Sequence, residues 1–175
     1  MQFNHDNMTG VQLAADLVNL CSSDDWSRAS IDALLRDYDI RRVEVDPAVA
    51  AALRRWSIRL RPVFEAIDTA ARCHAINALL VDGAASVYLT THDDLRPHLH
   101  FAPDDDDLVG RLMAVTAGSL AIFAVEAEGS RLGACARMGC ARVFVDTSRT
   151  GRRAYCCARC GNADAVQRHR ARVAR

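Results

Sequence analysis

The sequence contains no lysine: all 22 basic residues are arginine, and they are balanced by 22 aspartate and glutamate residues. It also lacks an uninterrupted apolar run close to the roughly 18 residues that a membrane helix needs. Its first ten residues, MQFNHDNMTG, have neither the basic block nor the apolar block of a signal peptide. Half of the residues are apolar and a quarter are charged, which excludes wholesale disorder. We therefore expect a cytoplasmic protein that contacts no membrane.

Residues 1–130 also lack an internal repeat, a phosphate-binding glycine loop and a motif that pairs a nucleophile with a base. His98 and His100 alternate with Leu99 and Phe101, so both imidazoles are expected on one face of a short strand. They could form a metal pair, but no third ligand is nearby, which favours a solvated strand face. The histidines are otherwise scattered, and we expect that the protein is not an enzyme.

The charge is divided sharply along the chain. Residues 1–130 hold 11 Arg against 20 acidic residues, a net charge of −9, whereas residues 131–175 hold 11 Arg against 2 acidic residues, a net charge of +9. This asymmetry predicts two modules with different partners: a body over 1–130 and a basic tail over 131–175.

Apolar periodicity in the body predicts a mostly helical domain. Thr9 is the expected N-cap of the first helix, and Pro62 is expected to break or kink the third near Leu60. The runs 85–91 and 96–102 predict a β-hairpin. An acidic run ends just before the last helix and favours a capped helix start over a calcium site. The predicted helices cover 9–20, 28–40, 47–60, 70–80 and 108–126.

The cysteines are concentrated in the basic tail. In a chain without an export signal, clustered cysteines indicate a metal site before disulfides. Cys21 and Cys73 stand alone, and we expect them to be small buried apolar residues. The cluster consists of Cys135, Cys140, Cys156, Cys157 and Cys160.

The order of motifs in the tail predicts a treble-clef zinc finger. Cys135 and Cys140 enclose a tight turn at Gly139, strands are expected at 143–146 and 152–155, and a helix begins with the last cysteines. Four thiolates suit tetrahedral Zn²⁺ and leave no coordination position open for a substrate. We therefore expect one structural zinc ion, although an iron–sulfur cluster or a thiol redox switch would use the same atoms.

The third ligand is not decided by spacing. Cys156 lies four residues before Cys160 and Cys157 lies three before it, so either pair can meet on one helical turn. The common C-x2-C spacing favours Cys157. His169 lies more than two turns beyond Cys160 and is a poor ligand candidate.

The segment FVDTSRTGRRAYCCARCGN resembles the CGNR-type zinc finger of bacterial proteins that carry an N-terminal ABATE domain. LAADLVNL, at 13–20, is similar to the opening of that domain. The resemblance implies an α/β body, a treble-clef finger and a role in transcription regulation. Family fingers place an aromatic residue before the third cysteine, which matches Tyr155. The resemblance thus implies Cys135, Cys140, Cys156 and Cys160 as the zinc ligands.

One departure from the family motif affects the expected activity. The motif ends in Arg, but here Asn162 is followed by Ala163 and then by Asp164. The helix start has therefore lost positive charge that could help to hold a phosphate, and we expect weaker nucleic-acid binding than in relatives with basic residues there.

Together these observations predict an α+β fold: a mostly helical N-terminal domain with a small β-hairpin, followed by a treble-clef zinc finger. We interpret the protein as a transcription regulator whose basic finger binds nucleic acid, with DNA preferred, and whose body senses a small-molecule effector or a protein partner. Asp16 and Asn19 are the polar residues of the first helix that could contact such an effector, but hydrogen bonding to the next loop or capping is the favoured interpretation. The predicted nucleic-acid contacts are Arg149, Arg152, Arg153, Arg168, Arg170 and Arg172.

The alternative function is protein interaction. The opposite charges of the two modules allow the basic finger to dock on an acidic partner or on the chain's own acidic body. Docking on the body would cover the basic face and prevent nucleic-acid binding.

Overall fold

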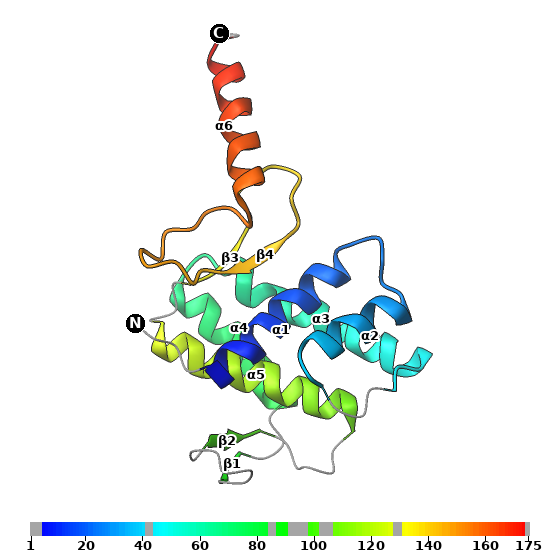
Figure 1. Ribbon diagram of the computed structural model, residues 1–175. Coiled ribbons are helices and arrows are strands. Elements are labelled where there is room, and N and C mark those ends of the chain that lie inside the picture. Colours follow the sequence, from blue (N-terminus) through cyan, green and yellow to red (C-terminus); the bar gives the residue numbers. More distant parts are fainter. Residues whose placement is uncertain are drawn as a thin grey trace.

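The computed structural model describes residues 5–40, 44–83, 87–90, 98–101, 107–127 and 131–173. Within these residues, helices α1 to α5 and the short β1–β2 hairpin form the body, and the β3–β4 hairpin leads to a projecting α6 (Figure 1). The predicted α+β fold class, a mostly helical domain followed by a cysteine cluster, is confirmed. The elements are α1 His5–Cys21, α2 Arg28–Asp37, α3 Pro47–Glu65, α4 Thr69–Gly83, β1 Tyr88–Thr90, β2 His98–His100, α5 Leu108–Glu126, β3 Leu132–Ala134, β4 Val143–Val145 and α6 Ala158–Val173.

Helix starts in the body are fixed by side-chain caps. Ser27 caps α2, and Asp46 Oδ1 accepts from Val49 N at 2.8 Å at the start of α3. Asp107 Oδ1 accepts from Gly110 N at 2.7 Å, which satisfies an otherwise unpaired N–H at the start of α5. The cap predicted at the end of the acidic run is thus present, and the preceding residues 104–106 lie outside the described residues.

The two largest differences from the predicted helix boundaries lie at the start of α1 and at the end of α3. α1 begins at His5, one turn before the predicted cap, because Met8 packs against the core and extends the helix beyond Thr9. α3 continues through Pro62 to Glu65 and does not break near Leu60. Proline removes one backbone hydrogen bond near the end of this helix, but Val63 and Phe64 are fully buried beyond it, and their packing offsets that loss.

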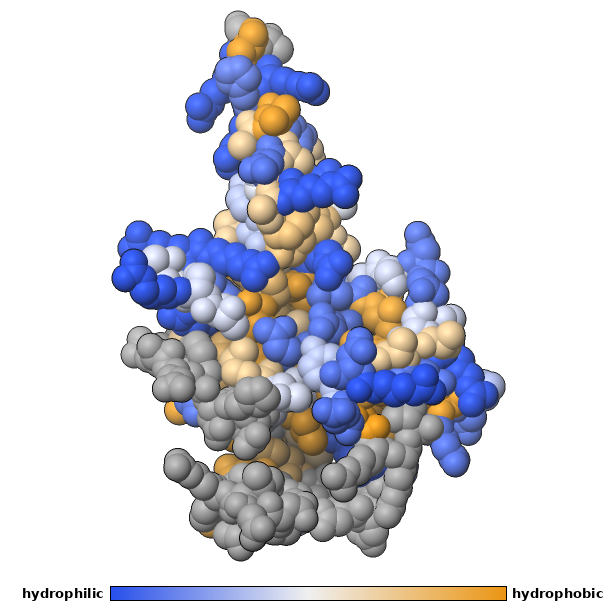
Figure 2. Space-filling model, viewed as in Figure 1, coloured by the Kyte–Doolittle hydropathy of each residue, from blue (hydrophilic) through white to orange (hydrophobic). Residues whose placement is uncertain are grey.

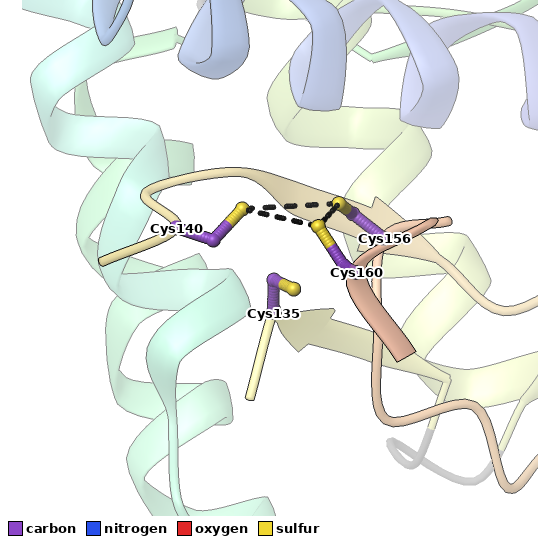
Figure 3. Close-up of side chains that lie close together, drawn as sticks. All are labelled: Cys135, Cys140, Cys156 and Cys160. Carbon is purple, nitrogen blue, oxygen red and sulfur yellow. Dashed lines mark hydrogen bonds between the residues drawn. The ribbon is translucent and has the colours of Figure 1, made fainter. Parts of the chain in front are cut away.

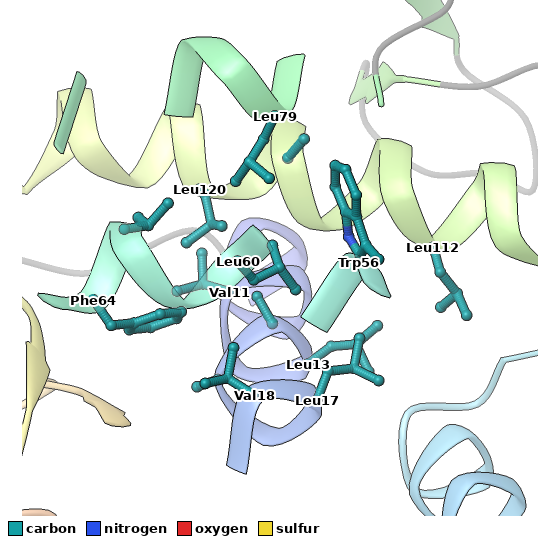
Figure 4. Close-up of a cluster of buried hydrophobic side chains, with 14 of the residues drawn as sticks. Val11, Leu13, Leu17, Val18, Trp56, Leu60, Phe64, Leu79, Leu112 and Leu120 are labelled. Atoms are coloured by element: carbon teal, nitrogen blue, oxygen red, sulfur yellow. The ribbon is translucent and has the colours of Figure 1, made fainter. Parts of the chain in front are cut away.

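The core lies between α1, α3, α4 and α5, with α5 against both α1 and α4 (Figure 4). Trp56 of α3 is buried and its indole N–H donates to Thr116 Oγ1 of α5 at 2.9 Å. Gly10 allows α1 and α5 to approach closely, since a Cβ there would lie 2.1 Å from Ser119 Oγ. These contacts place α1 and α5 side by side at the centre of the body.

The expectation that no apolar run approaches membrane-spanning length was wrong for α5. Among the described residues, Leu108–Glu126 is long and apolar enough to cross a membrane by length and composition. Arg111 interrupts the run in the sequence, which is why a search for an unbroken segment missed it. Half of its apolar window is buried against the other helices, as in the core helix of a soluble domain.

The two hairpins agree only partly with prediction. β1 pairs with β2 in antiparallel register, Tyr88 opposite His100, as expected; the side chains of His98 and His100, the candidate metal pair, lie outside the described residues. In the tail, however, β4 pairs with β3 and not with residues 152–155. The backbone of 152–155 instead bonds elsewhere, because Arg153 N donates to Asp146 Oδ2 and Ala154 O accepts from Ala136 N.

The β3–β4 hairpin packs on the body through α1 and α3. Leu132, Val143 and Val145 are each at most 4% exposed and belong to the same hydrophobic cluster as the body helices. Hairpin and body therefore share one core, whereas α6 stands away from it (Figure 1). The division at residue 130 stays a prediction.

Candidate metal centre

The first cysteine pair is positioned by the end of the β3–β4 hairpin. Cys135 follows β3 and extends the ladder by one bond, from its N–H to Arg142 O at 2.9 Å. The chain then turns, with Cys140 N donating to Arg137 O at 3.0 Å. Gly139 has φ +79°, a conformation that residues with a Cβ adopt at a cost. This glycine allows the tight turn that brings both sulfur atoms to one side.

The second pair depends on the loop 146–157 that leads into α6. Asp146 is buried at 2% exposure, and its carboxylate accepts from Ser148 N at 2.9 Å and from Arg153 N at 2.8 Å. These bonds lower the pKa of Asp146 although burial alone would raise it. Arg131 Nη1 donates to the carbonyls of Asp146 and Ser148. The loop is thus folded around one buried carboxylate.

Arg153 fixes the chain just before the third sulfur atom. Its Nε donates to Tyr155 O at 2.8 Å, its Nη2 donates to Cys156 O, and its guanidinium lies 5.0 Å from the centroid of the Phe144 ring. Arg153 therefore holds the backbone that precedes Cys156, whereas the sequence predicted it to contact nucleic acid.

The structure brings the four predicted ligand residues together (Figure 3). Cys156 Sγ lies 3.5 Å from Cys160 Sγ, and Cys140 Sγ lies 3.8 and 3.9 Å from these two. Cys135 completes the group, in which all four sulfur atoms lie within 4.8 Å of one another. Four sulfur atoms at a Zn–S distance of about 2.3 Å are separated by about 3.8 Å in a regular tetrahedron. The cluster therefore has the size of a four-cysteine zinc site.

The charges around the cluster also fit a divalent cation. Burial opposes ionisation of Cys135, but N–H groups of Cys156 and Arg137 and the adjacent thiols together lower its pKa to about 7. Burial and hydrogen bonding among the thiols raise the pKa of Cys156. Four thiolates this close need a compensating cation, and soft sulfur donors in a closed tetrahedron select structural Zn²⁺.

Arg137 contributes a hydrogen bond to the metal centre that was not predicted from the sequence. Its Nη1 lies 3.9 Å from Cys160 Sγ and donates to that sulfur. A zinc ion with four thiolates carries a net charge of −2, which this guanidinium partly balances. The available sequence signal was its place inside the Cys135-x4-Cys140 turn.

Cys157 lies outside the four-sulfur group. It is exposed, and its sulfur is 3.9 Å from Cys156 Sγ. Of the two lone cysteines, Cys73 is exposed and Cys21 is half-buried, so the expectation that both are buried core residues was wrong. Cys73 follows the buried Arg72 on α4, at an exposed position that helical periodicity did not distinguish from a buried one.

Asn19 joins the metal-binding segment to the body. Its Nδ2 donates to Val143 O at 3.1 Å and its Oδ1 accepts from Val143 N at 2.8 Å. The side-chain amide thus pairs with β4 as a neighbouring strand would. Asp16, the other polar residue singled out on α1, accepts from the Tyr38 hydroxyl at 2.6 Å and holds α2 to α1.

We expect Asn19→Ala to lower the free energy of unfolding by about 2 kcal/mol, because it leaves the N–H and C=O of Val143 without protein partners. Urea titration monitored by tryptophan fluorescence measures the change. Asn77→Ala, at an exposed position of α4, is the matched control and is expected to change stability by less than about 0.5 kcal/mol. Equal effects of the two substitutions would contradict the role of Asn19.

The six predicted nucleic-acid contacts separate into two groups. Arg153 is engaged in the loop, and Arg168 Nη1 forms an ion pair with Asp164 Oδ2 at 3.0 Å. The remaining four are exposed and have no ion pair within the described residues; we call them the basic surface. Its members are Arg149, Arg152, Arg170 and Arg172.

The basic surface is spread over two elements that diverge. The loop 146–157 leaves the hairpin to one side, while α6 extends outward over about 24 Å at 1.5 Å per residue (Figure 1). Hydrophilic side chains project from both (Figure 2). Arg149 and Arg172 therefore lie at opposite ends of the surface and do not converge on one point.

Asp164, one residue beyond the final position of the family motif, has a structural role here. Its Oδ2 accepts from the Tyr155 hydroxyl at 2.8 Å and pairs with Arg168. Arg168 Nη1 also donates to Tyr155 Oη at 3.2 Å. This triad ties the second turn of α6 to the residue just before Cys156.

Comparison with known proteins agrees with the geometry of this centre. Residues 131–173 match the family model of the CGNR zinc finger, a match that covers 43 of the 175 residues and all four clustered cysteines. No curated protein shows significant similarity to the chain. The segment 131–173 is accordingly similar to CGNR zinc fingers, whereas the ABATE resemblance of residues 1–130 stays a prediction.

Proposed function

We propose that this chain, with a CGNR zinc finger at residues 131–173, is a regulator of transcription that binds DNA through its basic surface. The observation that carries this proposal is the position of α6, which packs extensively against no other helix or strand of the described residues. The second half of this helix holds three arginines. The zinc site is closed and holds the finger together, so the proposed role is binding and not catalysis.

The exposure of α6 supports this proposal. Every residue from Ala165 to Val173 is exposed, and the helix has no buried residue after Cys160. Helices of this length are marginal in water unless one face is packed. Cys160 and the Tyr155–Asp164 bond anchor only the first turns, so the outer turns gain stability when they bind a partner.

Nucleic acid suits the chemistry of that partner. Arginine guanidinium groups pair with phosphates, and each contact releases a counterion from DNA. Residues 131–175 have 11 Arg against two acidic residues, Asp146 and Asp164, and both acids are engaged within the finger itself. The surface that remains is cationic on both the loop and the helix.

The test is the salt dependence of DNA binding by the full, zinc-loaded chain. The full chain is required because residues 131–173 alone would expose the apolar side of the hairpin that packs on the body. Arg152→Ala and Arg170→Ala should each reduce the slope of log K against log [salt] by about 0.9, since each removes one phosphate contact. Fluorescence anisotropy with a labelled duplex measures the slope.

Arg36→Ala is the matched control, because it removes the same charge from an exposed position near the end of α2 in the body. It should leave the slope unchanged. An equal loss of slope with Arg36→Ala, or no salt-sensitive binding to any duplex at low ionic strength, would contradict the proposal.

The body would supply the regulation. A groove of about 800 Å³ lies between α3 and α4, and a smaller pocket of about 190 Å³ lies between α4 and α5. The smaller one is lined in part by Arg72, whose Nη2 also donates to Leu132 O of β3 at 3.1 Å. An effector or partner that moved Arg72 would therefore act directly on the hairpin that carries the finger.

A cytoplasmic protein-interaction role is the second candidate, favoured by one feature of α6. Val166 and Val173 are 51% and 74% exposed and lie seven residues apart, hence on one face of the helix. An acidic partner protein would bury these valines, while phosphates would not contact them. Val166→Ser with Val173→Ser should leave DNA binding unchanged under the first proposal and abolish partner binding under the second.

A further inference from the structure

Cys157 is the one cysteine of the cluster that the zinc site does not use. It directly precedes α6 and is exposed, whereas Cys160, three residues later, is 6% exposed inside the four-sulfur group. The sequence Cys157-Ala158-Arg159-Cys160 therefore places an accessible thiol and a buried one across the first turn of one helix. Dithiols that form disulfides reversibly are commonly arranged in this way, at C-x-x-C spacing.

We propose that Cys157 is an oxidation site for hydroperoxides and that its oxidation leads to a Cys157–Cys160 disulfide and release of the zinc ion. The proposal rests on the zinc site and is independent of nucleic-acid binding. Cys157 is the most accessible of the five cysteines in the finger, because it is exposed while the other four are half-buried or buried. Its sulfur lies 3.9 Å from Cys156 Sγ.

The chemistry has two balanced steps. The Cys157 thiol attacks the terminal oxygen of a hydroperoxide, the O–O bond breaks, and the products are a sulfenic acid and an alcohol, or water when the oxidant is hydrogen peroxide. The sulfur of Cys160 then attacks Cys157 Sγ, the S–O bond breaks, and hydroxide leaves and takes up a proton as water. Two cysteines lose two electrons in total, and one peroxide gains them.

Cys160 suits the second step better than Cys156. A disulfide between the adjacent residues 156 and 157 would close a ring through a single peptide bond and force it from planarity. Residues three apart on a helical turn face each other, with Cβ atoms about 5–6 Å apart, so a small movement of the first turn brings them to disulfide distance.

Loss of Cys160 would open the zinc site at its junction with α6. Cys160 is the buried residue of that helix, and its sulfur also accepts from Arg137. Three remaining thiolates bind Zn²⁺ less tightly than four, so the ion becomes available to a chelator. Reduction of the disulfide would restore the fourth ligand.

The experiment uses the full chain, loaded with zinc under anaerobic conditions and then treated with hydrogen peroxide. Free zinc is followed with a chromogenic chelator, and the oxidised cysteines are mapped by mass spectrometry of peptides. We expect zinc release together with a Cys157–Cys160 disulfide, both reversed by a thiol reductant and added zinc. Cys157→Ser should bind one zinc ion and release it about tenfold more slowly, because the four remaining thiolates are bound to zinc and less exposed, and therefore react less readily.

Cys73→Ser is the matched control, since it removes an exposed cysteine from α4, outside the cluster; it should release zinc at the wild-type rate. Cys157→Ala serves as a second variant if the serine disturbs the helix start. Zinc release from both Cys157 variants at the wild-type rate, or a disulfide between two other cysteines, would overturn the proposal. Purification of both variants without zinc would also overturn it, because Cys157 would then be a ligand.

Discussion

Replacing Cys140 with serine is expected to remove the zinc ion and to unfold α6 and the loop 146–157 while the body and the β3–β4 hairpin stay folded. Zinc binding at closed cysteine sites supplies roughly 10–16 kcal/mol, which is folding energy for the segment that the ion organises. Among the described residues, α6 packs extensively on no other helix or strand, and the loop encloses only the buried Asp146. The hairpin, by contrast, is held by the body core through Leu132, Val143 and Val145.

Metal analysis and amide hydrogen exchange measure the two parts of this result. Zinc should fall from about one ion per chain to near zero, and protection should be lost in α6 but kept in α1 and α5. Cys73→Ser, which leaves all four clustered cysteines in place, should change neither measurement. Iron with sulfide in anaerobically purified wild-type protein, or loss of protection throughout the body helices of the variant, would contradict the expectation.

The second large effect is expected at Arg72, the buried arginine of α4. Its Nε donates to Val63 O at 3.1 Å, and its Nη2 donates to Ala66 O and Leu132 O, each at 3.1 Å. It thus satisfies carbonyls at the end of α3 and binds the first strand of the zinc-finger segment to the body. Burial lowers the pKa of this guanidinium, but arginine stays protonated throughout the working range of proteins.

Arg72→Leu is expected to reduce the free energy of unfolding by about 3–5 kcal/mol. Three carbonyl groups would lose a charged donor, and each unsatisfied buried group costs roughly 1–3 kcal/mol. Urea unfolding followed by circular dichroism measures the loss. Arg55→Leu, at an exposed position of α3, is the matched control and is expected to change stability by less than about 0.5 kcal/mol. A similar loss in both variants would mean that charge, and not the bridge from α3 to β3, is responsible.

The sequence by itself determined the helical body and the location of the metal site. Apolar residues such as Leu53, Trp56 and Leu60 recur at helical spacing, and a helix buries whatever face that spacing forms. The cysteine spacing was equally informative, because a tetrahedral ion accepts four sulfur atoms from two short local motifs. The choice of Cys156 needed more than spacing, since one helical turn accommodates either neighbour. It came from the resemblance to CGNR fingers, which place an aromatic residue before the third cysteine.

Only the tertiary structure decided how the zinc-finger segment is attached and which arginines remain available. The amide of Asn19 pairs with Val143, 124 residues away, and Arg72 bridges to Leu132, 60 residues away. Likewise Arg153 and Arg168 resemble their neighbours in sequence, yet one holds the loop backbone and the other pairs with Asp164. Packing geometry sets the hydrogen-bond partners that are distant in sequence. The periodicity of a segment specifies which side chains share a face of its helix or strand, but not what that face contacts.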